Sequence, residues 1–157
     1  EKQVSKLLSK IVNDLTKNNV EVRLDSKILK LAQKSNSSKL IKLAKKDDWG
    51  KEFLNLIVSI KSVKSLDDAI GHIESFSFGH TDGIISKNNQ NIKEFIQKVN
   101  SSAVTVNAST RFNDGGEIGL GSEIAISTTK VSPRGPLGLE EITTYKWVIE
   151  GKGHIRN

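Results

Sequence analysis

The sequence predicts an α/β protein: a three-layer α/β/α arrangement with a mainly parallel sheet. Two observations carry this prediction. Apolar residues recur at the spacing of an amphipathic helix in several segments. Short apolar runs typical of strands lie between those segments. Helices that alternate with strands in this way imply parallel strands joined by right-handed crossovers.

The first element is a helix that ends at Asn18 and Asn19. Six apolar residues before them share one helical face: Val4, Leu7, Leu8, Ile11, Val12 and Leu15. Residues 20–25 alternate between apolar and charged side chains, which predicts a short, half-exposed strand. Apolar residues within 28–32 favour a brief helix. The segment KLIKLAKK, residues 39–46, is too short to assign.

The longest apolar run, LNLIVSIKSV at residues 54–63, predicts a strand. Ser65 and Asp68 then resemble a helix N-cap with an acidic third position, so a helix is expected from there to about Phe76. The remaining expected elements are a strand at 81–86, a helix at 92–99 and a strand at 103–108. Because open α/β sheets bind ligands at the carboxyl ends of their strands, the segment NASTRF that begins at Asn107 is expected in a ligand-binding position.

The composition excludes several classes of function. The 157 residues contain no cysteine, which excludes disulfides, thiolate metal sites and thiol catalysis within this chain. The sequence has neither an apolar run long enough to span a membrane nor a signal-peptide pattern. The charge is uneven, since residues 1–46 hold 12 Lys and Arg against 4 Asp and Glu, and residues 47–157 hold 12 against 14. A basic half suggests nucleic-acid or membrane-surface binding, but lysines without interleaved aromatic residues favour a solvated surface.

The loop after the third strand holds the main candidate site. Its GGEIGLGSE stretch matches neither common glycine-rich phosphate motif, so it is either a flexible turn or a loop whose backbone passes close to a ligand. Arg111 would pair there with a carboxylate or a phosphate, with Ser109 and Thr110 as hydroxyl donors. The alternative for Arg111 is an internal ion pair with Asp114 or Glu117.

Two further observations concern the rest of the chain. His72, His80 and His154 are scattered and lack metal-ligand spacing, so no metal site is expected, and no catalytic nucleophile is readable. Residues 143–150 alternate in the manner of a late strand that has no partner nearby in the sequence. Since such a strand needs an edge to pair with, a neighbouring subunit is a reasonable candidate.

Four stretches together resemble the C-terminal part of the gamma-glutamyl phosphate reductase (glutamate-5-semialdehyde dehydrogenase) family, within the aldehyde dehydrogenase superfamily. In order, they are DDWGKEFL, SLDDAIGHIESFSFGHTDGI, VNASTRFNDGGEIGLGSEIAIST and RGPLGLEEITTYKWVIEGKG. The resemblance covers residues 47–157 almost continuously. It implies NADPH-dependent reduction of L-glutamyl 5-phosphate to L-glutamate 5-semialdehyde and phosphate, in proline biosynthesis. It also implies that the catalytic cysteine lies upstream, so that this chain is an inactive fragment when alone.

The resemblance also suggests roles for individual residues. DDWG resembles a superfamily motif at the nicotinamide ribose, which makes Asp47 and Trp49 candidates for cofactor binding. NASTRF resembles a segment at the substrate entrance, which makes Asn107, Ser109, Thr110 and Arg111 candidates for holding the glutamyl carboxylate or the leaving phosphate. Glu117 is a candidate pocket-wall or cofactor-side residue, and we group it with the cofactor contacts.

The expected organisation follows from the same resemblance. Residues 1–128 are expected to form a partial catalytic domain, and residues 129–157 a return segment with an oligomerisation arm that makes a homo-oligomer. The expected setting is the cytoplasm, with possible coupling to glutamate 5-kinase and with neither nucleic acid nor membrane as a partner. Two alternatives stay open: the reductase half of a bifunctional kinase–reductase, or a non-enzymatic basic binding module that uses residues 1–46.

Overall fold

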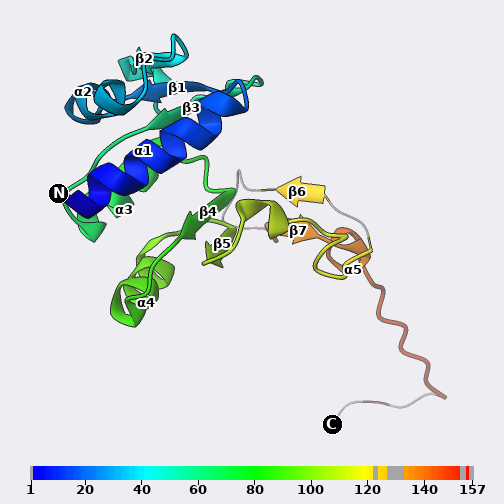
Figure 1. Ribbon diagram of the computed structural model, residues 1–157. Helices are drawn as coiled ribbons and strands as arrows, with labels where there is room; N and C mark the ends of the chain where they lie inside the picture. Colours follow the sequence, from blue (N-terminus) through cyan, green and yellow to red (C-terminus); the bar gives the residue numbers. More distant parts are fainter. Residues whose placement is uncertain (1, 122–123, 127–132, 153–154, 156–157) are drawn as a thin grey trace. The chain divides into compact units, whose positions relative to one another are not determined.

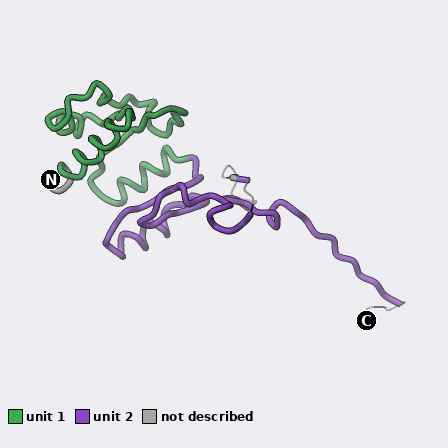
Figure 2. The backbone as a smooth tube through the Cα atoms, turned by 45° about the vertical axis from the view of Figure 1, so that its right-hand side comes forward, with its two compact units in different colours: residues 1–77 green, residues 78–157 purple. Residues whose placement is uncertain are grey.

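The chain forms two compact units, residues 1–77 and residues 78–157 (Figure 2). The computed structural model describes residues 2–121, 124–126, 133–152 and 155. Helices and strands alternate through most of both units (Figure 1). The predicted boundary between residues 128 and 129 lies outside the described residues and stays a prediction.

The first unit is built on a parallel sheet of three short strands in the order β2-β1-β3. The strands are β1 (Glu21–Leu24), β2 (Ile41–Leu43) and β3 (Ile57–Ile60). In the central strand, Val22 pairs with Ile41 on one side and with Val58 on the other. The strands expected within 20–25 and 54–63 are therefore confirmed, and the unassigned segment 39–46 contains an edge strand.

Two helices, α1 (Lys2–Lys17) and α2 (Ser26–Ser35), cover one face of this sheet. Because successive strand residues point to opposite faces, Val22 and Leu24 both point toward these helices and are fully buried. The buried core of this unit contains side chains from both helices and from strands β1 and β2: Leu8, Val12, Val22, Leu24, Ile28, Ala32 and Ile41. Asp25 begins α2, since its carboxylate accepts hydrogen bonds from the amides of Lys27 and Ile28.

A third helix, α3 (Leu66–Phe76), packs against Trp49 and Gly50, the two residues that follow the short helix η1 (Lys46–Asp48). Its predicted N-cap is confirmed, because the Ser65 hydroxyl accepts a hydrogen bond from the amide of Asp68 at 3.1 Å. Gly50 has a positive φ of 73°, and a Cβ there would lie 2.5 Å from the carbonyl oxygen of Phe76. Only glycine therefore lets this turn approach the end of α3 so closely.

The second unit contains a parallel pair, β4 (Thr81–Ile84) and β5 (Ala103–Val106), connected by helix α4 (Asn89–Lys98). The short helix η2 (Thr110–Phe112) follows β5. An antiparallel pair comes next, β6 (Ile124–Ile126) with β7 (Gly135–Leu137), and a single helical turn, α5 (Leu139–Ile142), ends the regular structure.

The α/β class with parallel strands is confirmed, but the sequence did not predict which strands pair. Strand β3 pairs with β1, whereas β4 pairs with β5. The reason is that local periodicity identifies strands without identifying their neighbours. The α/β/α layering stays a prediction, and so does the pairing of residues 143–150 with a second subunit. Within a single chain these residues form no strand, and their side chains are exposed.

Candidate functional site

The loop after β5 surrounds an open hollow of about 320 Å³. Its lining consists of five side chains from one short segment: Ser109, Arg111, Phe112, Asp114 and Glu117. Three of the predicted site residues, Ser109, Arg111 and Glu117, are thus brought together. Sequence reasoning missed Phe112 as a site residue and considered Asp114 only as an ion-pair partner.

Local hydrogen bonds fix the shape of this loop. The hydroxyl of Ser109 begins η2 by accepting from the amide of Arg111 at 3.2 Å. One carboxylate oxygen of Asp114 accepts from the amides of Gly116 and Glu117, at 2.8 and 3.2 Å. This Asx turn, written in the sequence as Asp-Gly-Gly, is the signal that would have identified Asp114 as a member of the site.

The glycines of the loop serve its turns. Gly119 and Gly121 have φ values of 85° and 72°, a region that residues with a Cβ rarely adopt. A Cβ at either position would meet nothing within 4 Å. Both glycines therefore serve turns, whereas Leu120 between them does approach another segment, since a Cβ on Gly138 would stand 3.3 Å from the Leu120 Cβ and 3.4 Å from its carbonyl oxygen. The approach of this stretch to a ligand stays a prediction.

The guanidinium of Arg111 is exposed and unpaired within the described part of the chain. The internal ion pair with Asp114 or Glu117, the alternative left open by the sequence, is not formed. Arg111 is therefore available for a carboxylate or phosphate group, which its planar set of N–H donors matches in bidentate fashion.

The other two loop candidates, Asn107 and Thr110, do not line the hollow. The side-chain amide of Asn107 accepts from the amide of Ser86 at 2.9 Å and donates to the Ser86 carbonyl at 3.0 Å. Asn107 also has a positive φ of 52°. It therefore links the ends of β4 and β5, at the point where the chain turns toward η2.

Thr110 lies against the sheet of the second unit. A Cβ on Gly83 of β4 would stand 2.4 Å from the Thr105 hydroxyl oxygen and 3.5 Å from Cγ2 of Thr110. Glycine at position 83 therefore makes room for the Thr105 side chain on β5, and Thr110 lies at ordinary contact distance beside it. Asn113 attaches the other end of η2, donating to the Thr81 hydroxyl at 2.6 Å. Both contacts hold in place the segment that carries Arg111.

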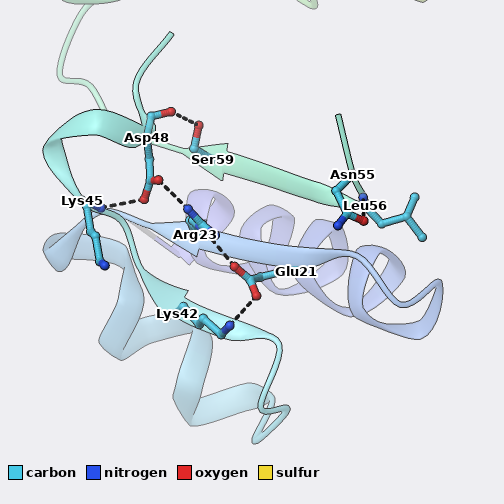
Figure 3. A network of polar contacts seen from close by, with 8 residues as sticks. All are labelled: Glu21, Arg23, Lys42, Lys45, Asp48, Asn55, Leu56 and Ser59. Atoms are coloured by element: carbon cyan, nitrogen blue, oxygen red, sulfur yellow. Dashed lines mark hydrogen bonds and ion pairs between the residues drawn. The ribbon is translucent and has the colours of Figure 1, made fainter. Parts of the chain in front are cut away.

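The two cofactor candidates from the DDWG motif lie in the first unit, and they differ in environment. Asp47 is exposed, whereas its neighbour Asp48 is buried, with 3% of its surface accessible. Figure 3 shows Asp48 above the polar face of the sheet, where it contacts Arg23 at 2.5 Å and accepts from the amide of Lys45 at 2.8 Å. Of these two acids, only Asp47 has a carboxylate without a partner among the described residues.

The network around Asp48 is an extended one. Arg23 also contacts Glu21 at 2.7 Å, Glu21 in turn contacts Lys42, and the Arg23 guanidinium lies 4.8 Å from the ring centre of Phe53. The Lys45 amide and the Arg23 guanidinium hold the pKa of Asp48 below its ordinary value, against the opposing effect of burial. The network therefore fixes η1, from which Asp47 and Trp49 extend.

Trp49 is half-buried in an aromatic cluster with α3. Its ring lies 5.6 Å from the His72 ring in an edge-on arrangement, and the His72 ring lies 4.7 Å from that of Phe76. Lys61 contacts Nδ1 of His72 at 3.2 Å. Burial, and then the charge of Lys61, lower the pKa of His72. His72 thus packs against Trp49 and supports it, and its lowered pKa favours the uncharged ring.

Neither a metal centre nor a membrane-spanning helix is found in the described part of the chain. No group of three or more potential ligands for a metal ion occurs among the residues that the structure describes. Within the same described ranges, no helix has the length and apolar character needed to cross a bilayer. His154 lies outside the described residues.

Comparisons with known proteins give a consistent answer. No protein-family model matches the chain. The gamma-glutamyl phosphate reductase of Clostridium botulinum strain Alaska E43 is 49% identical over 156 residues, which are 99% of this chain and 36% of that protein. The same-named protein of Dehalococcoides mccartyi strain 195 is 47% identical over 146 residues, which are 93% of this chain and 34% of the relative.

Solved structures agree with the sequence relatives. The crystal structure of gamma-glutamyl phosphate reductase from Thermotoga maritima matches all of this chain and 36% of that one, with a TM-score of 0.83 and 44% identity. The corresponding structure from Saccharomyces cerevisiae covers 71% of this chain and 28% of its own, with a TM-score of 0.54 and 30% identity. The chain thus spans about a third of the length of the relatives that it matches. Along nearly its whole length, the chain is homologous to a C-terminal part of gamma-glutamyl phosphate reductase.

Proposed function

We propose that this chain forms part of an NADPH-dependent reductase that converts L-glutamyl 5-phosphate into L-glutamate 5-semialdehyde in proline biosynthesis. The observation that supports the proposal most directly is the guanidinium of Arg111 in the hollow after β5, which has no partner among the described residues, in a chain 49% identical to a named gamma-glutamyl phosphate reductase. An unpaired arginine at the end of a parallel strand is suited to an anionic substrate.

The balanced reaction requires groups that this chain does not contain. Overall, the bond between the acyl carbon and the phosphate oxygen would break and a C–H bond would form at that carbon, so one proton and the hydride that NADPH would supply are consumed and inorganic phosphate and NADP⁺ are released. An acyl phosphate is reduced through attack by a thiolate, and the 157 residues contain no cysteine. We therefore expect the reaction in a longer polypeptide and none from these residues alone.

Within that reaction we assign roles by environment. Ser109 and Arg111 contact the substrate, and Glu117, which lines the same hollow, forms the pocket wall. Asn107 and Thr110 position this segment through Ser86 and the sheet around Gly83. On the cofactor side, Asp47 offers an exposed carboxylate that suits ribose hydroxyls, and Trp49 offers an aromatic edge supported by His72. NADPH supplies the hydride when bound.

The proposal extends to partners and setting. Residues 143–150 expose Tyr145, Trp147 and Ile149, each at least 80% accessible, in an extended segment without a strand partner among the described residues. These side chains are suited to adding a strand to a second subunit. We further propose a cytoplasmic enzyme, coupled to glutamate 5-kinase as a separate protein or as a second half of one chain.

The experiment is Arg111→Ala in a full-length reductase that carries these 157 residues. We expect kcat/KM for L-glutamate 5-semialdehyde, assayed with NADP⁺ and phosphate, to fall about 10- to 100-fold, since hydrogen bonds to charged groups contribute about 1.5–3 kcal/mol. The KM for NADP⁺ should stay unchanged. As a charge-matched control, Lys93→Ala removes an exposed cation on α4 and should leave both constants at wild-type values. Unchanged kinetics in Arg111→Ala would remove Arg111 from the site.

A further inference from the structure

The hollow after β5 carries both signs of charge, and this mixture bears on which end of the substrate it binds. One cation, Arg111, and two acids, Asp114 and Glu117, line the same small space. All three come from a single segment whose shape is set by its own turns. The relative placement of the charges is therefore a local property of the second unit.

A phosphate group fits this lining poorly. It carries close to two negative charges at neutral pH and would share this small hollow with two carboxylates as well as the guanidinium, and like charges repel. An α-amino acid group carries one positive and one negative charge. Its carboxylate matches the bidentate donors of Arg111, and its ammonium group offers three donors to Asp114 and Glu117.

The hydrogen bonds of Asp114 leave part of its carboxylate for such a ligand. The backbone amides of Gly116 and Glu117 both donate hydrogen bonds to the same oxygen of Asp114, Oδ1. Oδ2 accepts no hydrogen bond from any residue that the structure describes. Phe112, with 58% of its surface exposed, supplies an apolar wall of the hollow that suits the methylene groups next to the head group.

We propose that the hollow formed by Ser109, Arg111, Phe112, Asp114 and Glu117 binds the zwitterionic α-amino acid head group of the substrate, and that the acyl phosphate end lies outside it. Arg111 binds the α-carboxylate, and Asp114 and Glu117 bind the α-ammonium group. This inference rests on the proposed reductase function. It decides between the two ligands, glutamyl carboxylate and leaving phosphate, that the sequence leaves open for Arg111.

The kinetic test compares variants of the full-length reductase with two aldehydes, L-glutamate 5-semialdehyde and 5-oxopentanoate, which lacks the amino group. In the wild type, we expect the semialdehyde to have the higher kcat/KM. Asp114→Asn, which keeps the turn acceptor Oδ1, and Glu117→Gln should each reduce this preference about 10-fold. Arg111→Gln should lower kcat/KM about 10- to 100-fold for both aldehydes, because both keep the carboxylate, and should leave the KM for phosphate unchanged.

The result that would overturn the head-group assignment is a raised KM for phosphate in Arg111→Gln with unchanged use of the semialdehyde. An unchanged preference between the two aldehydes in both acid variants would equally overturn it. Binding of L-glutamate, measured by calorimetry, separates these failures from failure of the reductase function. The full-length protein could bind L-glutamate through Arg111 and yet fail to reduce NADP⁺ in the presence of phosphate and the semialdehyde. That result would refute the reductase proposal and leave the head-group assignment standing. Loss of L-glutamate binding in Arg111→Gln but not in Lys93→Gln is the expected result.

Discussion

Replacing Gly50 with alanine tests how tightly the turn that carries Trp49 is held against α3. The change adds a single methyl group at a residue whose φ is 73°. That methyl group would stand 2.5 Å from the carbonyl oxygen of Phe76 and 3.3 Å from its Cβ. Both the backbone conformation and the neighbouring helix therefore oppose the substitution.

The expected cost combines two effects. A left-handed conformation costs a residue with a Cβ about 1–2 kcal/mol. Forcing extra volume into a packed contact costs typically about 1–3 kcal/mol, and here the obstructing atom belongs to the backbone, which cannot rotate away. We therefore expect Gly50→Ala to lower the free energy of unfolding of the first unit by about 2–5 kcal/mol.

The assay is urea unfolding followed by tryptophan fluorescence in a Trp147→Phe background, where Trp49 is the remaining tryptophan and reports on the first unit. The matched control is Gly71→Ala within α3, where an added Cβ meets nothing within 4 Å. That change should stabilise the unit by about 0.5–1 kcal/mol, because alanine favours helix over glycine. Equal midpoints for Gly50→Ala and the wild type would refute the close contact with Phe76.

Three further outcomes are expected from the same assay. Leu24→Ala, at a fully buried position, should cost about 2–5 kcal/mol, as large-to-small core substitutions do. Ser65→Ala should cost about 1 kcal/mol through loss of the α3 N-cap. The pKa of Asp48 is lowered in the folded state, so its contribution is complete above the unfolded value of about 3.9 and is lost as the pH falls through the folded pKa. Asp48→Asn should remove that dependence, and an unchanged pH profile would contradict it.

The sequence was most informative where one segment determines its own structure. The helix α1, the Ser65 cap and the alternation in β1 each depend on residues close in the chain, and each is confirmed. The apolar stripe of α1 is confirmed only in part, because Leu8 and Val12 are buried whereas Leu7 and Ile11 are exposed. Strand order depends instead on contacts between distant segments, so the pairing of β3 with β1 was not predicted. The edge strand β2 has three residues, too few for a periodic signal.

The same distinction applies to the two candidate sites. The hollow after β5 is encoded in residues 109–117, whose turns and caps are local, so three of its five lining residues were predictable. The Trp49 cluster depends on α3 through Gly50 and His72, which follow η1 in the chain without any local signal of contact. Gly50→Ala should therefore affect cofactor use together with stability in a full-length reductase. Arg111→Ala should affect substrate use with stability unchanged, since its exposed guanidinium makes no ion pair within the described residues. If Gly50→Ala instead affected substrate use and Arg111→Ala affected cofactor use, the roles of the two segments would have been assigned the wrong way round.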